Sequence, residues 1–271
     1  MSALSWPRRL ARVSAVLALA GLLSANGIDG SRPAFASPSQ SAVDGSYTFD
    51  ANGWAGTLAV SGAATGWPSI DMRLSNGATE HLVGFWSAAA RTLTIGRPLG
   101  GGVSQTYTLY LGDHHPSSPV FGGFFTESDT GATRYGAYAQ WHQPPGMPRT
   151  FSVASTVPSP RPSNLLPGWD FNGNGWTGSL SWDPLGCNGS PAQLQFDGNV
   201  HWEPVADTWD PSTSTLTLVR ALSGGLSQTY TLYLSPHHAE TGRMLGGFFT
   251  QSDSPGMRFA AFADAETDFG C

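Results

Sequence analysis

The chain contains an internal repeat. The motif SQTYTLYLGDHH returns as SQTYTLYLSPHH, FGGFFTESD returns as LGGFFTQSD, and FDANGWAGTL returns as FNGNGWTGSL. The offset between the copies grows only from 122 to 124 residues, so two whole modules are duplicated in order. A repeat of this length constrains the fold first, because each copy must form the same unit. The matching segments are 104–115 with 227–238, 121–129 with 245–253, and 49–58 with 171–180.

The first 36 residues have the pattern of an export signal. An arginine-rich stretch (residues 8–12) precedes an apolar run (13–23), and a small-x-small cleavage pattern follows at 34–36. The apolar run is too short to span a bilayer, which needs about 20 residues, and no other run is long or apolar enough. We therefore predict a signal peptide over 1–36 and a secreted protein without a membrane span after cleavage.

The charge balance narrows the possible partners. The whole chain has a formal net charge of −6 and no lysine. Without residues 1–36, which hold four arginines and one aspartate, nine basic residues face eighteen acidic ones, for a net charge of −9. Nucleic acids and anionic membrane surfaces are bound through basic surfaces, so neither is expected as a partner. The composition leaves the oligomeric state open.

A proline-rich stretch separates the two copies. Residues 142–168 hold seven prolines and many serines and threonines. Proline removes a backbone donor, so this stretch is predicted to be an extended linker and not a central strand. We call residues 43–141 module 1 and residues 169–271 module 2.

Inside each module the hydrophobic pattern has the period of a β-strand. In WTGSLSW (residues 176–182), Trp176, Leu180 and Trp182 share one face with Gly178, and the hydroxyl residues share the other. About seven such strands are expected per module, with no helix after the signal. The prediction is all-β: two tandem antiparallel β-barrel modules, with β-sandwiches as the alternative.

Glycines and a tryptophan favour the barrel. The glycine pairs 122–123 and 246–247 lie within strand patterns, where they suit bulges or tight corners of a closed sheet. Each module also begins on a Gly-Trp strand and ends on a strand with an arginine; these residues are Gly53, Trp54 and Arg134, and Gly175, Trp176 and Arg258. In this, each module resembles the calycin superfamily of lipocalins and avidins, where a tryptophan on the first strand packs under a basic residue from the last. The resemblance implies a barrel. Avidin's biotin-site motifs have no convincing counterpart, so biotin binding is not implied.

Four polar positions match between the copies and form the candidate ligand-binding site. Arg97 lies on the face of Leu93 and Ile95, so it is predicted to point inward. A buried guanidinium needs a carboxylate or a ligand, and Glu80 is the candidate partner. Two interpretations stay open: an Arg–Glu bridge that closes the barrel end, or a binding mouth with polar anchors above an apolar cup. The candidates are Glu80, Arg97, Gln105 and Tyr107, with Glu203, Arg220, Gln228 and Tyr230.

Two further sets of residues have alternative interpretations. The histidine pairs 114–115 and 237–238 are predicted to be loop residues, because adjacent histidines diverge and a metal would need another ligand. No metal or cofactor is expected. Tyr110 and Tyr233 lie on the threonine face of their strands, where they would form either a sugar-stacking face or ordinary cross-strand pairs.

The motifs favour a binding protein over an enzyme. The sequence has no Gly-x-Ser-x-Gly elbow, no His-Glu-x-x-His and no phosphate loop. We predict a secreted, non-enzymatic protein that binds a glycan or a small amphipathic molecule. One alternative is a secreted hydrolase using Glu80 and Glu203, although a glycosidase needs a second carboxylate in each module. The other is a structural or inhibitory protein without a small-molecule site.

Cys187 and Cys271 are the only cysteines of the chain, and both lie in module 2. In an exported protein an even count favours a disulfide, worth about 2–4 kcal/mol of stability. We expect the native, unreduced protein to resist alkylation and to accept two alkyl groups after reduction, as measured by intact mass. Two free thiols in the native protein would contradict the bond.

Overall fold

The computed structural model describes residues 43–75, 77, 79–114, 118–141, 165, 168–182, 192–235 and 244–265. The predicted signal peptide, both cysteines and most of the predicted linker lie outside these ranges, so those predictions stay untested. Within the described ranges, no helix is long and apolar enough to cross a bilayer.

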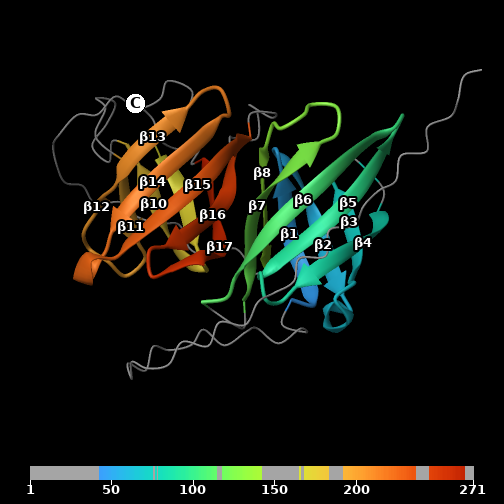
Figure 1. Cartoon of the computed structure of the whole chain (residues 1–271), viewed down its shortest axis with the longest axis horizontal. Helices are drawn as coiled ribbons and strands as arrows, with labels where there is room; N and C mark the ends of the chain where they lie inside the picture. Colours follow the sequence, from blue (N-terminus) through green and yellow to red (C-terminus); the bar gives the residue numbers. More distant parts are fainter. Residues whose placement is uncertain are drawn as a thin grey trace, which may run out of the picture. The chain divides into compact units, whose positions relative to one another are not determined.

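Module 1 is a closed antiparallel barrel (Figure 1). Each strand pairs with the next along the chain, and β1 pairs with β8 to close the sheet. Closure leaves the barrel without edge strands. The strands are β1 (Gly45–Ala51), β2 (Trp54–Ser61), β3 (Ser69–Leu74), β4 (Thr79–Ser87), β5 (Thr92–Gly100), β6 (Val103–Gly112), β7 (Val120–Glu127) and β8 (Tyr135–Trp141), with a 3-10 turn at Ala63–Thr65.

Module 2 follows the same strand order and forms a nine-stranded sheet. β17 pairs with β9, and the sequence of neighbours is otherwise sequential. The strands are β9 (Gly168–Gly173), β10 (Trp176–Ser181), β11 (Gln193–Phe196), β12 (Glu203–Pro204), β13 (Ala206–Asp210), β14 (Thr215–Ala221), β15 (Ser227–Ser235), β16 (Met244–Gln251) and β17 (Ser254–Ala265), with a 3-10 turn at Ser223–Gly225. The predicted all-β fold of two tandem barrel-like modules is therefore confirmed in the described residues.

The strand counts of eight and nine exceed the expected seven, and one break explains why the two differ. In module 1, β4 pairs with β3 through its first half and with β5 through its second. In module 2 the same stretch is divided into β12 and β13, which pair with β11 and β14. The division falls at Pro204, which has no backbone N–H to donate, and at the buried Val205.

The predicted alternation places the core inside each barrel. In β3, Ile70, Met72 and Leu74 are buried while the residues between them are exposed. Module 2 buries two large aromatic side chains completely, Trp169 and Trp182. Each module thus has its own apolar core.

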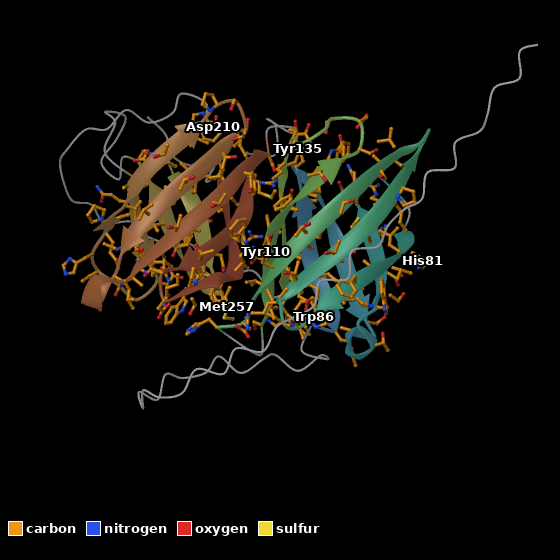
Figure 2. All side chains as sticks on the ribbon, in the orientation of Figure 1. His81, Trp86, Tyr110, Tyr135, Asp210 and Met257 are labelled. Carbon is orange, nitrogen blue, oxygen red and sulfur yellow. The ribbon has the colours of Figure 1, made fainter. Side chains whose placement is uncertain are left out.

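The outer faces of β6–β8 and β15–β17 contact each other, and we call this contact the intermodule face. The ring of Tyr110 packs 4.9 Å from that of Phe248, and the ring of Phe124 packs 5.0 Å from that of Tyr233. Both tyrosines are only 4% exposed. Of the two interpretations of these tyrosines, the exposed sugar-stacking face is therefore wrong: Tyr110, labelled in Figure 2, points out of its barrel but is covered by module 2. Both tyrosines form cross-strand pairs with threonines, Tyr110 with Thr92 and Tyr233 with Thr215.

The intermodule face has approximate two-fold symmetry. The Arg134 guanidinium donates to the Tyr233 hydroxyl at 2.9 Å, and Arg258 donates to Tyr110 at 2.9 Å. Each arginine also lies over the neighbouring phenylalanine ring, at 4.8 Å for Phe124 and 4.7 Å for Phe248. Matched surfaces that meet in this way are typical of an isologous dimer. The resemblance implies that the tryptophan of each Gly-Trp strand packs under these arginines, whereas here the arginines pack on the aromatic residues of the intermodule face.

The paired glycines allow the two backbones to approach closely. A Cβ on Gly122 would lie 2.7 Å from backbone atoms of Ala261, and one on Gly246 would lie 2.4 Å from the nitrogen of Ala137. The second glycine of each pair instead abuts its own sheet, since a Cβ on Gly123 would lie 2.0 Å from the carbonyl oxygen of Thr108. Of the two expectations for these glycines, a bulge or a tight corner, the bulge is wrong, because the strand register runs through both pairs without a shift.

Two further contacts join the modules. The ring of Tyr138 stacks on Phe262 with centroids 4.4 Å apart, and its hydroxyl donates to Asp264 at 2.6 Å. Burial raises the pKa of Asp264 to about 7. At a second point, the backbone nitrogen of His114 donates to the carbonyl of Asn174, and its ring stacks on Trp176 at 3.7 Å. His114 is thus a loop residue, as predicted; the other three histidines of the two pairs lie outside the described residues.

We expect Gly122→Ala to destabilise the protein, because its methyl group would overlap the backbone of module 2. Overpacking of this kind costs about 1–3 kcal/mol. The free energy of unfolding in urea measures the effect. Gly96→Ala is the matched control, since a Cβ at this strand glycine would meet no atom within 4 Å. Equal stability of the two variants would contradict the close approach.

Candidate functional site

The candidate site of module 1 is a row of polar side chains across neighbouring strands. Arg97 on β5 pairs in register with Gln105 on β6, and Gln105 pairs with Glu127 on β7. Arg97 lies two residues after Ile95, which is fully buried. Residues two apart on a strand share a face, so Arg97 also points into the barrel. Register alone therefore places these three side chains side by side at one end of the barrel.

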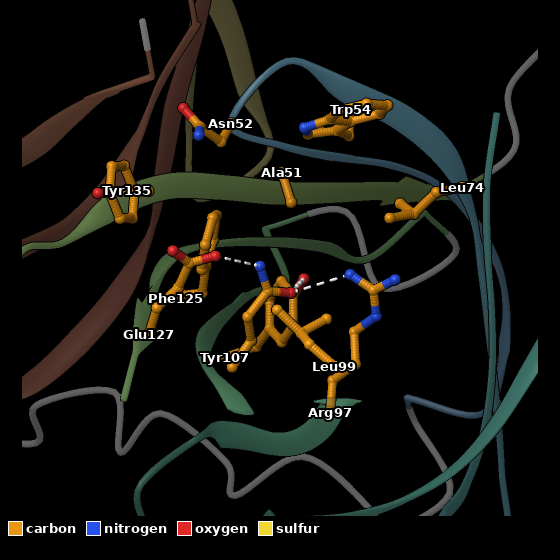
Figure 3. Close-up of a pocket in the computed structure, with 11 residues that line it drawn as sticks. Ala51, Asn52, Trp54, Leu74, Arg97, Leu99, Tyr107, Phe125, Glu127 and Tyr135 are labelled. Atoms are coloured by element: carbon orange, nitrogen blue, oxygen red, sulfur yellow. Dashed lines mark hydrogen bonds between the residues drawn. The ribbon is translucent and has the colours of Figure 1, made fainter. Parts of the chain in front are cut away.

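Hydrogen bonds connect the row into one network. Arg97 donates from Nε to Glu80 Oε2 at 2.8 Å and from Nη2 to Oε1 at 2.5 Å. It also donates from Nη1 to Gln105 Oε1 at 3.0 Å, and the Tyr107 hydroxyl donates to the same oxygen at 2.7 Å. Gln105 Nε2 donates to Glu127 at 2.6 Å. Arg97 and Glu127 therefore lie at opposite ends of the row, with Gln105 between them (Figure 3). The predicted inward, paired Arg97 is confirmed.

Module 2 repeats the network with its matching residues. Arg220 donates to both oxygens of Glu203, at 2.7 and 3.0 Å, and to Gln228 Oε1 at 3.1 Å. The Tyr230 hydroxyl donates to Gln228 Oε1 at 2.8 Å. The last member of the row differs, because Gln251 accepts from Gln228 in place of a carboxylate. All eight candidate residues are thus brought together, four in each module.

The electrostatics of the network hold Glu80 in its ionised form. The hydrogen bond from Arg97 lowers the pKa of the Glu80 carboxyl, and burial raises the pKa of the Tyr107 phenol to about 12. The Arg97 side chain is 15% exposed and that of Glu80 is 37% exposed. The ion pair therefore lies at the boundary between core and solvent, and Glu80 has no proton to donate near neutral pH.

A cavity of about 400 Å³ opens beside the network of module 1, and we call it the mouth cavity (Figure 3). One wall is polar and consists of Arg97, Gln105, Tyr107 and Glu127. The rest of the lining is largely apolar and aromatic. Its side chains come from the first strands, the β5 end and the last strands: Ala51, Asn52, Trp54, Leu74, Leu99, Phe125 and Tyr135.

The sequence patterns missed Glu127 and the aromatic wall of the mouth cavity. Glu127 lies on the inward face of Phe125, so strand parity alone points to it. Comparison of the copies does not reveal it, because module 2 has Gln251 at the matching position. The resemblance implies a packing role for Trp54 at the start of the barrel, whereas it lines the cavity.

Comparison with known proteins yields neither a matching protein-family model nor a matching curated protein. The two modules can still be compared with each other. Leu74, which pairs with Gly56 and lines the mouth cavity, corresponds to Phe196, which pairs with Gly178. In module 2 the guanidinium of Arg220 lies 4.6 Å from the centre of the Phe196 ring. Apart from Glu127 and Gln251 the two networks match, but only Arg220 has an aromatic ring over its guanidinium from this position.

Within the described part of the chain, no three histidine, cysteine, aspartate or glutamate side chains are grouped to hold a metal ion. The network offers hydrogen-bond donors and acceptors on a rigid sheet. Its carboxylates are Glu80 and Glu127 in module 1, and Glu203 and Asp253 in module 2. Each of them already accepts a hydrogen bond from a neighbour. This arrangement is suited to recognition of a polar ligand.

We expect Arg97→Ala to lower the free energy of unfolding by about 1–2 kcal/mol, because it removes charged hydrogen bonds while Glu80 keeps access to solvent. Urea unfolding measures the change. Arg73→Ala, at an exposed position on β3, is the matched control and should change stability by less than about 0.5 kcal/mol. If the two variants were equally stable, the Arg97 network would not contribute to the stability of the fold.

Proposed function

We propose that the protein is an exported, non-enzymatic binding protein and that the mouth cavity of module 1 takes a sugar residue of a glycan. The observation that carries the proposal is the mixed lining of this cavity of about 400 Å³, with four polar side chains among apolar and aromatic ones. Pockets for small ligands are concave and of about 300–1,000 Å³, with a few fixed polar groups among apolar walls. The mouth cavity meets these conditions.

The chemistry of the two walls supports a sugar among small amphipathic molecules. Hydroxyl groups of a pyranose ring match the mixed donors and acceptors of Arg97, Gln105 and Glu127. The apolar face of the ring matches the aromatic side chains of Trp54 and Tyr135. Since the polar wall is already hydrogen-bonded within itself, it is preorganised and loses little entropy on binding.

The hydrolase alternative has less support. A general acid must hold a proton near the working pH, and Arg97 lowers the pKa of Glu80. A pair of carboxylates is the usual requirement for glycoside hydrolysis, and Gln251 replaces Glu127 in module 2. The structural alternative is favoured for module 2 alone, where the Phe196 ring covers the Arg220 guanidinium.

A glycan array probed with the mature protein tests the proposal, followed by titration calorimetry with the bound glycan. We expect Leu74→Phe to reduce affinity at least about 10-fold, equivalent to about 1.4 kcal/mol, because the larger side chain would fill part of the mouth cavity, which Leu74 lines. Phe196→Leu is the matched control and should leave this affinity unchanged. An array without a bound glycan, or undiminished binding by a folded Leu74→Phe variant, would refute the proposal.

A further inference from the structure

A second hollow of about 400 Å³ lies at the intermodule face, apart from the mouth cavity. On the side of module 1 it is lined by the turn between β7 and β8, including Thr133 and Arg134. On the side of module 2 it is lined by the turn between β13 and β14 and by Thr231 and Tyr233 of β15. We call it the intermodule hollow.

The approximate two-fold symmetry shows why this hollow is open. Ser214 immediately precedes Thr215, which pairs with Tyr233; at the matching place, Arg91 precedes Thr92, which pairs with Tyr110. Ser214 and Arg91 have the same left-handed backbone, with φ of 50° and 55°. One position of the repeat thus carries a short hydroxyl side chain in module 2 and a long cationic one in module 1.

In the symmetry-related half, the side chain of Arg91 reaches across to module 2. Arg91 is only 3% exposed, its guanidinium lies 5.4 Å from the centre of the Phe259 ring, and it forms an ion pair with Asp113 at 2.5 Å. Phe259 directly follows Arg258, the symmetry mate of Arg134. The serine at position 214 is too short to make the equivalent contact, so the space beside Arg134 stays open.

The lining has the chemistry of a site for a hydroxylated anion. Four of the lining residues, Thr133, Ser212, Ser214 and Thr231, have side-chain hydroxyl groups. The Ser212 hydroxyl donates to Asp210 at 2.6 Å and that of Thr133 to the Thr130 carbonyl at 3.3 Å, so both offer a ligand their oxygen lone pairs. Arg134 is the one charged residue of the lining, and among the described residues it donates to the Tyr233 hydroxyl and pairs with no carboxylate. A guanidinium with free N–H groups binds a carboxylate through two parallel hydrogen bonds.

We propose that the intermodule hollow binds a sugar that carries a carboxylate, of the uronic acid class. Arg134 binds the carboxylate, and the surrounding serine and threonine hydroxyls bind the hydroxyl groups of the ring. The ligand thereby contacts both modules. This site is separate from the mouth cavity and does not depend on a ligand there.

Titration calorimetry on the mature Leu74→Phe protein, in which the mouth cavity is narrowed, tests the proposal with glucuronate and galacturonate. Glucose and galactose are the neutral matched probes. We expect one of the two uronates to bind and its neutral counterpart to bind at least about 10-fold more weakly, because the neutral sugar lacks the charge-assisted hydrogen bonds. No binding of either uronate would overturn the proposal and leave the mouth cavity proposal standing.

Two arginine variants separate binding from packing. Arg134→Met and Arg258→Met remove equivalent contacts with Tyr233 and Tyr110 and should lower thermal stability alike. Only Arg134→Met should abolish uronate binding. Equal loss of binding in both variants would show that the arginines act through the fold alone, and would refute the assignment.

Ser214→Arg places a longer side chain in the intermodule hollow. It copies Arg91 into module 2 on a backbone that already has the required φ, so we expect a folded protein without uronate binding. Retained binding in this variant would overturn the proposed location. Full competition by inorganic sulfate with equal affinity would reduce the site to a general anion site and would contradict the sugar class.

Discussion

The close approach of two sheet backbones at Gly122 and Gly246 underlies the rest of the structure. Only where a strand has no Cβ can one barrel come this near to the backbone of another. The approach brings the aromatic pairs within ring contact and buries them between the modules. It also sets the turn of module 1 at Arg134 beside the turn of module 2 at Ser214, and so creates the intermodule hollow.

Strand parity predicts much of the barrel interior and little of its exterior. Because Leu93 and Ile95 must be buried, Arg97 can be placed inward from the sequence alone, and Glu80 follows as its partner. The same pattern assigns Tyr110 to an outer face, but period-two alternation does not say whether that face meets water or a second module. For the same reason, the sequence of module 1 does not reveal why position 122 is a glycine. A Cβ there would overlap the backbone of module 2.

Differences between the copies locate the open spaces. A leucine at position 74 accompanies the mouth cavity in module 1, whereas the matching Phe196 lies over Arg220. At the intermodule face it is module 2 that has the shorter side chain. Arg91 of module 1 is long and buried, whereas Ser214 of module 2 is short and lines the intermodule hollow. The two modules therefore share one framework, and single residue differences at matching positions accompany the open spaces.

The hydrogen bond between Tyr138 and Asp264 makes the intermodule face heterotypic. If two copies of module 2 met through this face, Phe262 would pack on Phe262. The buried Asp264 carboxyl, whose pKa is already raised, would lose the hydrogen bond that Tyr138 donates. Two copies of module 1 would bring tyrosine to tyrosine without the aspartate. The shape of the face suits a pair of unlike modules and a pair of identical modules. Its hydrogen bonding disfavours the pairs of identical modules. Unlike modules of one chain are therefore preferred partners over identical modules of two chains.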